Sequence, residues 1–407
     1  MMTVADQMEV IRRGVVDLLP EGEFERKLEL AAKESRPLRV KLGADPSAPD
    51  LHLGHVVVLR KLAQFQELGH HVIFLIGDFT GRIGDPTGRS ETRKALTREE
   101  VQANAETYRE QIFRVLDPDK TSVRFNSEWM EKMNGADMVR LCAQFTVARM
   151  LERDDFEKRM AEGRAIGIHE FLYPLAQAYD SVALEADVEI GGTDQRFNLL
   201  VGREIQKAYG QAPQAVLTMP LLEGTDGRQK MSKSLGNSIG IGEPPEEIFG
   251  KVMSISDDLM LRYAELLGTG TSDLQVRMET EGLHPMEAKK ALAADIVGQF
   301  HGPEAARGAR EHFEQRFQKG QAYEPKEFEV AAADASGIQL SRILVEIGFA
   351  RSGSEARRLA AQGAIRLEGE AAPDPLILLE PGRTHLVAVG KRRLARVKIV
   401  HESGRHP

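Results

Sequence analysis

The sequence predicts an α/β protein whose first and largest part is a doubly wound, Rossmann-like parallel sheet. In the first half of the 407-residue chain, apolar strand-like runs alternate with longer runs at helical spacing. Such alternation joins parallel strands through crossover helices. From about Ile241 to Gln321 the strand-like runs stop and helical patterns dominate. We therefore expect an all-helical domain after the sheet.

The elements of the first part are expected in a definite order. The N-terminal stretch MMTVADQMEVIRRGVVDLL has the pattern of an amphipathic helix. It is followed by a strand at 38–44 (LRVKLGA), a helix at 52–69, a strand at 71–76 (HVIFLI), a polar helix from about Arg98, and strands at 121–126, 186–192 (ADVEIGG) and 214–220, with a helix at 194–210 before the last strand. Ligands of such folds bind beyond the carboxyl ends of the strands, so we look for a site there.

The remaining chain divides by composition. Helical patterns occur in PPEEIFGKVM, DDLMLRYAELL, PMEAKKALAADIVGQF and EAARGAREHFEQRF, whereas the segment 326–337 shows little periodicity and ends in small residues. We expect a sheet domain over 1–235, a helical domain over 236–325, a linker over 326–337 and a small α+β domain over 338–402. The last of these contains 11 Lys and Arg but six Asp and Glu between residues 338 and 400, which makes it net +5 in a chain of net charge -8. A basic module on an acidic body suggests a separate unit that binds a polyanion.

Composition also excludes several classes of protein. Hydrophobic residues make up 42% of the chain, yet no apolar run approaches the ~20 residues of a membrane span. The N-terminus does not have the pattern of a signal peptide, so we expect a cytoplasmic protein without membrane contact. Cys142 is the single cysteine, which excludes an intrachain disulfide and a Cys-based zinc site. We expect its side chain to be packed as a small hydrophobe.

Four polar patches fall at or just after predicted strand ends. The first is HLGH at 52–55, where two histidines and Gly54 open a helix whose first amides favour anions. The second is GDFTGRIGDPTGRSETR at 77–93, in which Arg89 and Arg93 are spaced to contact a polyphosphate. Read alone, the first could be a locally hydrogen-bonded histidine pair and the second a mobile charged loop.

The third and fourth patches are GGTDQ at 191–195 and KMSKS at 230–234. Paired glycines let a ligand approach the backbone, and Asp194 could accept ribose hydroxyls, although Gly-Gly-x-Asp is also a common helix cap. The lysines of KMSKS lie between glycines, so the segment could close over a polyphosphate or be an ordinary solvated loop. The four patches in this order on an alternating α/β chain are far more specific than any one of them.

HLGH and KMSKS match the two signature motifs of the class I aminoacyl-tRNA synthetases, and the chain resembles the bacterial tyrosyl enzymes of that class over nearly its full length. The resemblance implies ATP as a substrate, with Mg²⁺ carried by ATP and no metal site of the protein. It implies transition-state roles for His52, His55, Lys230, Lys233 and Ser234. It also implies a set of ATP contacts, which includes Lys233 a second time: Asp45, Ser47, Gly54, Arg89, Arg93, Gly192, Asp194 and Lys233.

The amino-acid pocket is suggested by YPLAQAYD at 173–180, since Tyr173, Gln177 and Asp180 share one face of a helix. The resemblance implies that L-tyrosine is contacted by Lys41, Gly43, Thr80, Asp85, Tyr173, Gln177, Asp180 and Gln195, with Asp180 accepting the phenol hydroxyl. One branch of the family carries tyrosine at the position of Lys41. Either Lys41 replaces that contact, or the hydroxyl is recognised mainly by Asp180.

The last module resembles an S4-type RNA-binding domain, in which two short helices and a small sheet present a basic face. The resemblance implies tRNA(Tyr) as a partner, a homodimer, and phosphate contacts from Arg342, Arg351, Arg357, Arg358, Lys391, Arg392 and Arg393. We expect a two-step reaction, formation of tyrosyl-AMP followed by transfer of tyrosine to tRNA. Two alternatives remain open: a tryptophanyl enzyme of the same class, and a non-catalytic RNA-binding protein on a synthetase scaffold.

Overall fold

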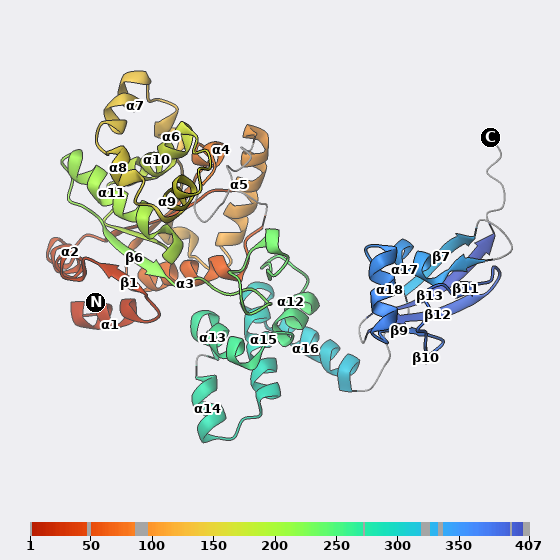
Figure 1. Cartoon of the computed structure of the whole chain (residues 1–407). Coiled ribbons are helices and arrows are strands. Elements are labelled where there is room, and N and C mark those ends of the chain that lie inside the picture. The colour runs from red at the N-terminus through yellow and green to blue at the C-terminus, as the bar shows by residue number, and fades with distance from the viewer. Residues whose placement is uncertain are drawn as a thin grey trace. The chain divides into compact units, whose positions relative to one another are not determined.

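A computed structural model describes residues 2–46, 50–85, 97–271, 273–318, 326–332, 337–390 and 393–401. The chain forms two compact units, Met1–Arg310 and Glu311–Pro407 (Figure 1). Within the described residues, no helix is long and apolar enough to cross a membrane.

The first unit is built on a six-stranded sheet with the strand order β1-β6-β5-β2-β3-β4. Its strands are β1 (Asp17–Leu19), β2 (Arg39–Ala44), β3 (His71–Ile76), β4 (Thr121–Phe125), β5 (Val188–Gly192) and β6 (Ala215–Met219). The five strands from β6 to β4 are parallel, as the sequence predicts. Strand β1 was not expected, and it pairs antiparallel with β6, so the sheet is mixed. Three residues are too few to show a strand period.

Helices cover both faces of this sheet. Figure 1 shows α1 (Val4–Arg12) and α3 (Leu53–Glu67) on one side, and α10 (Ile168–Leu184) and α11 (Arg196–Ala208) on the other. The other helices of this part are α2 (Glu21–Glu34), α4 (Thr80–Ile83), α5 (Arg98–Ile112), α6 (Ser127–Met130), α7 (Gly135–Cys142), α8 (Val147–Met150) and α9 (Asp154–Ala161). Residues 72–76 of β3 are all buried, because helices lie above and below the central strands.

The expected helical segment is present as α12 (Pro245–Met253), α13 (Asp257–Leu267), α14 (Leu274–Thr280), α15 (Pro285–His301) and α16 (Pro303–Gln318). It packs within the same compact unit as the sheet up to Arg310. Helix α13 contacts both α15 and α3, so the helical segment rests on the helix that begins at HLGH. Cys142 ends α7 and packs against an apolar cluster, as expected.

The second unit contains the helices and small sheets expected of its resemblance. Helices α17 (Leu340–Glu346) and α18 (Gly353–Ala361) accompany a sheet of order β10-β9-β12-β13-β7 and a two-stranded sheet β11-β8. The strands are β7 (Lys326–Ala332), β8 (Ile338–Gln339), β9 (Ile365–Leu367), β10 (Glu370–Ala371), β11 (Leu378–Leu379), β12 (Thr384–Val389) and β13 (Arg393–His401).

The prediction of a linker over 326–337 is wrong for its first seven residues, which form strand β7. Strand β7 pairs in parallel with β13 along its whole length. Val330 and Ala332 are buried in the core of this unit and Phe328 packs against it, whereas Glu327 and Glu329 are exposed. This alternation of apolar and charged residues is a strand signal.

Candidate active site

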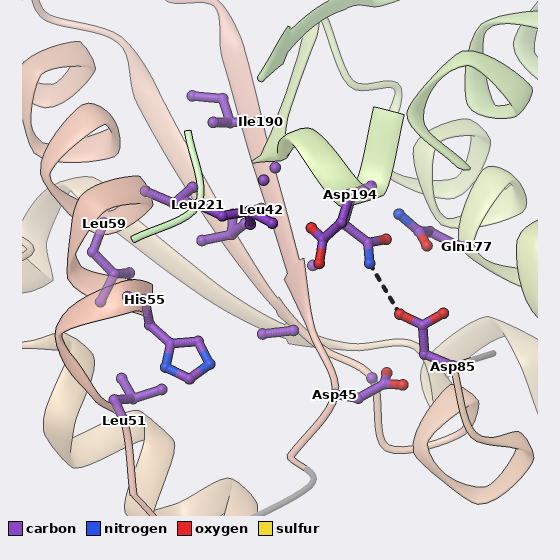
Figure 2. Close-up of a pocket in the computed structure, with 18 of the residues that line it drawn as sticks. Leu42, Asp45, Leu51, His55, Leu59, Asp85, Gln177, Ile190, Asp194 and Leu221 are labelled. Carbon is purple, nitrogen blue, oxygen red and sulfur yellow. Dashed lines mark hydrogen bonds between the residues drawn. The ribbon is translucent and has the colours of Figure 1, made fainter. Parts of the chain in front are cut away.

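A cavity of about 530 Å³ opens at the carboxyl ends of β2 and β5, beside the start of α3 (Figure 2). It is lined by β2, α3, α10, β5 and the segment that follows β6. Most of the residues predicted from sequence line it: Gly43, Asp45, His52, Gly54, His55, Thr80, Asp85, Tyr173, Gln177, Asp180, Gly192, Asp194, Gln195, Lys230 and Ser234.

The remaining predicted residues are not in this lining. Ser47, Arg89 and Arg93 lie outside the residues that the structure describes. Lys41 lies behind the wall of the cavity with no exposed surface, and Lys233 reaches Asp50 near its edge. The predicted RNA contacts belong to the second unit, where Arg342, Arg351, Arg357, Arg358 and Arg393 are exposed, and Lys391 and Arg392 are outside the described residues.

The two histidines of HLGH stack at the N-terminus of α3. Their ring centroids are 3.9 Å apart, and Nδ1 of His55 accepts a hydrogen bond of 3.2 Å from the backbone N–H of His52. A neutral His55 ring therefore carries its proton on Nε2. A methyl group at Gly54 would lie 3.0 Å from Nδ1 and Cε1 of His52, so a larger residue here would press on the ring.

Both histidines are held in the neutral form. Burial, the neighbouring His55 ring and the charge of Lys233 lower the pKa of His52 to about 2. Burial and Lys233 lower the pKa of His55 to about 4. At neutral pH each ring therefore offers one N–H donor and one nitrogen acceptor, without a positive charge.

The KMSKS segment is shaped by its own hydrogen bonds. The N–H of Met231 donates to the carbonyl of Leu222 at 2.8 Å, and the N–H of Ser232 donates to the side chain of Asn237 at 2.8 Å. Met231 is buried, whereas the side chains of Lys230 and Lys233 are partly exposed. The segment is therefore anchored at its centre.

Each lysine of the segment is paired with a carboxylate of the site. Lys230 Nζ lies 2.9 Å from Asp194, and Lys233 Nζ lies 3.0 Å from Asp50. These side chains are partly exposed, so the pairs are open to exchange with an anionic ligand. Asp50 was not predicted as a site residue.

A second group of polar side chains meets at the end of β2. The hydroxyl of Tyr173 donates to Asp45 at 2.9 Å, and the hydroxyl of Thr80 donates to the other carboxylate oxygen at 2.6 Å. Burial and Asp45 raise the pKa of Tyr173 well above its usual value, so it stays protonated.

A third group surrounds Asp85. Gln195 donates to Asp85 at 2.9 Å, and the guanidinium of Arg153 lies 3.2 Å from its other oxygen. Asn198 donates to both Gln177 and Gln195 at 3.0 Å. Arg153 and Asn198 were missed by the sequence reading, because no motif marks them.

Asp180 is 2% exposed and lines the cavity. It accepts hydrogen bonds from the indole N–H of Trp129 at 2.8 Å and from Asn126 at 3.4 Å. Burial raises its pKa to about 7, although Lys41 and these donors act in the opposite direction. Trp129 and Asn126 follow β4, in a segment without a recognisable motif.

Comparisons with known proteins agree with this geometry. A family model described as tRNA synthetases class I (W and Y) matches residues 33–318. A tyrosine–tRNA ligase from Geobacter sulfurreducens is 58% identical over 406 residues, which cover 97% of this chain and 99% of the relative. The chain belongs to the bacterial tyrosyl-tRNA synthetases of class I. This family membership makes it an aminoacyl-tRNA ligase and does not favour the tryptophanyl or non-catalytic alternatives.

Other relatives of this synthetase support the same assignment. A tyrosine–tRNA ligase from Moorella thermoacetica is 53% identical and covers 97% of this chain and 96% of the relative. The solved tyrosyl-tRNA synthetase of Archaeoglobus fulgidus, complexed with L-tyrosine, has a TM-score of 0.61 at 24% identity and covers 76% of this chain and 100% of that chain. At this identity the likeness shows a shared fold, and the Rossmann-like class I prediction is confirmed.

Proposed function

We propose that this synthetase activates L-tyrosine with ATP and then transfers tyrosine to the terminal adenosine of tRNA(Tyr). The proposal rests on one observation: a single cavity gathers the HLGH histidines, the KMSKS segment and the Tyr173–Asp180 face of α10. In the first step the tyrosine carboxylate attacks the α-phosphorus of ATP and pyrophosphate leaves. In the second step a ribose hydroxyl of the tRNA attacks the tyrosyl carbonyl and AMP leaves. The cytoplasm, where tRNA is used, is the compartment that we propose.

ATP is proposed to bind between α3 and the KMSKS segment. Asp194 follows β5 on a single 3-10 turn, so its carboxylate suits the ribose hydroxyls. The ribose would displace Lys230, and the phosphates would draw Lys233 from Asp50. Gly54 lets the His52 ring lie close to the backbone at the start of α3. Ser47, Arg89 and Arg93 remain predicted ATP contacts on the strength of the resemblance.

Catalysis is proposed to come from positioning and from charge stabilisation. A carboxylate is already ionised at neutral pH, so the first step needs no general base. The Nε2–H of His55 and an N–H of His52 can donate to phosphate oxygens. The KMSKS side chains can stabilise the negative charge that develops on the leaving pyrophosphate: Lys230, Lys233 and Ser234. A mobile segment suits this task, because its contacts are then strongest in the transition state.

Mg²⁺ is treated as part of the substrate. Among the residues that the structure describes, no group of three His, Cys, Asp or Glu side chains is arranged to hold a metal ion. The resemblance implies that Mg²⁺ is carried by ATP, and we propose that the chain's own residues bind and orient the nucleotide.

Tyrosine is proposed to lie along α10 with its ring toward Asp180. Tyr173, Gln177, Asp85 and Gln195 would bind the amino and carboxylate groups, with Gly43 and Thr80 along the wall. Asp180 would accept the phenol hydroxyl at the closed end. Phenylalanine would leave Asp180 without that partner, and a buried unpaired acceptor is costly.

The second unit is proposed to hold tRNA through its phosphates. The exposed arginines Arg342, Arg351, Arg357, Arg358 and Arg393 supply positive charge, and phosphate contacts give affinity that falls with salt. Lys391 and Arg392 stay predicted contacts. These contacts position the RNA without reading its sequence.

A homodimer is proposed from a run of exposed apolar side chains. Val139, Val147, Met160 and Ile168 come from four consecutive helices, α7 to α10, and are 57–82% exposed. A second copy of the chain would cover them. Ile168→Glu should weaken the dimer in sedimentation, and a mass of one chain for the unchanged protein would contradict the proposal.

The decisive experiment is exchange of labelled pyrophosphate into ATP, measured without tRNA in the presence of tyrosine, tryptophan or phenylalanine. We expect exchange with tyrosine and very little with the other two. Exchange with tryptophan alone would refute the reading of the Tyr173–Asp180 pocket. No exchange with any amino acid would refute the proposed activation step.

A further inference from the structure

Three charged side chains lie in or behind the wall of the cavity, and we call them the buried charge cluster: Lys41 on β2, Asp180 on α10 and Glu189 on β5. Their exposures are 0%, 2% and 1%. Lys41 Nζ and Glu189 Oε1 are 2.9 Å apart. Buried charges of this kind are costly unless each is paired and hydrogen-bonded.

Lys41 has no N–H left for a ligand. Its ammonium donates to the backbone carbonyl of Gln177 at 3.2 Å and to the hydroxyl of Ser181 at 2.8 Å, and the third partner is Glu189. An ammonium has three donors, so these three acceptors use all of them. Lys41 therefore does not replace the phenol contact that the sequence left open.

The contacts of Lys41 instead fix one turn of α10. Gln177 and Ser181 are four residues apart and flank Asp180 on that helix. Glu189 holds the same turn from β5, since its oxygens accept from Ser181 at 3.0 Å and from the side-chain amide of Gln177 at 3.4 Å. Gln214 also donates to Glu189. Side chains from the adjacent strands β2 and β5 thus hydrogen-bond to the turn of α10 that carries Gln177 and Asp180.

The cluster also sets the charge around Asp180. The ammonium of Lys41 favours the ionised form of Asp180, whereas Glu189 disfavours it. On the other sides Asp180 meets the uncharged donors Trp129 and Asn126. Beyond Trp129, the guanidinium of Arg124 lies over the indole ring and is paired with Glu128. Beyond Asn126, the Asn126 amide donates to the hydroxyl of Thr80, which in turn donates to Asp45.

We propose that Lys41 is a positioning residue for tyrosine recognition. Its ammonium, paired with Glu189, holds the Gln177–Ser181 turn on the sheet and supplies the positive charge that lets Asp180 accept the phenol hydroxyl as a carboxylate. The inference rests on the proposed function, because it assigns the phenol to Asp180. Lys41 itself touches neither tyrosine nor ATP.

The test compares four proteins by tyrosine-dependent pyrophosphate exchange: the unchanged chain, Lys41→Met, Glu189→Gln and the double variant. Lys61→Met is the matched control, because Lys61 is also a buried lysine, but it donates only to the backbone carbonyls of Val10, Ile11 and Arg13. For each protein, kcat and KM are measured for tyrosine and phenylalanine, and kcat/KM for tyrosine is followed from pH 5.5 to 8.5.

For Lys41→Met we expect the KM for tyrosine to rise about tenfold, with a smaller change in kcat. Without the ammonium, Asp180 is more often protonated, so the phenol hydroxyl donates to a neutral carboxyl group and not to a carboxylate. The preference for tyrosine over phenylalanine should fall by a similar factor. The midpoint of the pH profile should move upward by about one unit, since an opposite charge near Asp180 has been removed.

For Glu189→Gln the midpoint should move downward, because a like charge has been removed. The double variant should recover part of the tyrosine preference, since no unpaired carboxylate is left at Glu189. Lys61→Met should keep the unchanged profile even if it lowers thermal stability. If Lys41→Met does not fold, the downward shift in Glu189→Gln still decides the question.

Two results would overturn the inference: a tyrosine KM and preference in Lys41→Met equal to those of the unchanged chain, or a pH midpoint in Glu189→Gln that does not move. These outcomes are distinct from failure of the proposed function. In that case the unchanged chain itself would show no exchange with tyrosine.

Discussion

Replacing His55 by asparagine should make the sheet unit less sensitive to acid. Asparagine keeps an acceptor near the position of Nδ1, which receives the backbone N–H of His52 at 3.2 Å. The pKa of His55 is about 4 in the folded chain and 6.5 when unperturbed. Between these values the unfolded chain binds a proton that the folded chain does not, so the free energy of unfolding falls as the pH drops from 6.5 toward 4.

The size of this effect follows from the two pKa values. Between pH 7 and pH 5 the unfolded histidine gains most of its proton and the folded one gains almost none, which costs the folded state about 2 kcal/mol. The His55→Asn variant has no titrating group at this position, so it does not lose this part of its unfolding free energy. The unfolding free energy of the variant should therefore fall by about 2 kcal/mol less than that of the unchanged chain over the same interval.

Urea unfolding followed by tryptophan fluorescence measures this directly. Trp129 is the only tryptophan and lies in the same compact unit as His55, so its signal follows the unfolding of that unit. Between pH 7 and pH 8 the difference between the two proteins should stay constant, which is the internal control. An equal loss of stability in both proteins between pH 7 and pH 5 would refute the neutral, buried histidine.

Three further predictions concern the reaction. Lys233→Ala should lower the rate of tyrosyl-AMP formation by about 100-fold or more while the KM for tyrosine changes little, as expected for a contact made in the transition state; a similar loss in both would contradict that role. Tyr173→Phe removes the hydroxyl that donates to Asp45 at 2.9 Å, so the KM for tyrosine should rise about tenfold, and isothermal titration with tyrosine would show no change if the hydroxyl is irrelevant. Changing Arg357 and Arg358 to alanine should raise the KM for tRNA and flatten its salt dependence while pyrophosphate exchange stays unchanged; reduced exchange would place these arginines elsewhere.

Local patterns were sufficient for much of the fold and for the four polar patches, whereas the roles of the site residues come from the resemblance that HLGH and KMSKS carry. The strands of the parallel sheet are apolar runs, and the helix positions of Tyr173, Gln177 and Asp180 follow from their spacing. HLGH and KMSKS are contiguous motifs that open or follow regular elements. Features of this kind are visible in a sequence because neighbours in the chain are neighbours in space.

The remaining features depend on contacts between distant segments. Lys41 looked like a candidate for the phenol contact until its partner Glu189, on a neighbouring strand of the sheet, was known. Trp129 and Asn126 approach Asp180 from the segment after β4, and no local pattern marks either residue. Strand pairing and buried polar networks are set by tertiary structure, so propensity and spacing do not reveal them.

The two lysine pairs of the KMSKS segment mean that the proposed nucleotide site carries its own counter-ions. Asp194 already holds Lys230, and Asp50 already holds Lys233. In the proposed binding mode, the ribose hydroxyls replace Lys230 as the partner of Asp194, and the phosphates replace Asp50 as the partner of Lys233. A simple anion can compete for the two lysines, but it offers Asp194 no new hydrogen-bond donor. Such a site would favour the complete nucleotide over simple phosphates, because only a ligand with both parts can replace both pairs at once.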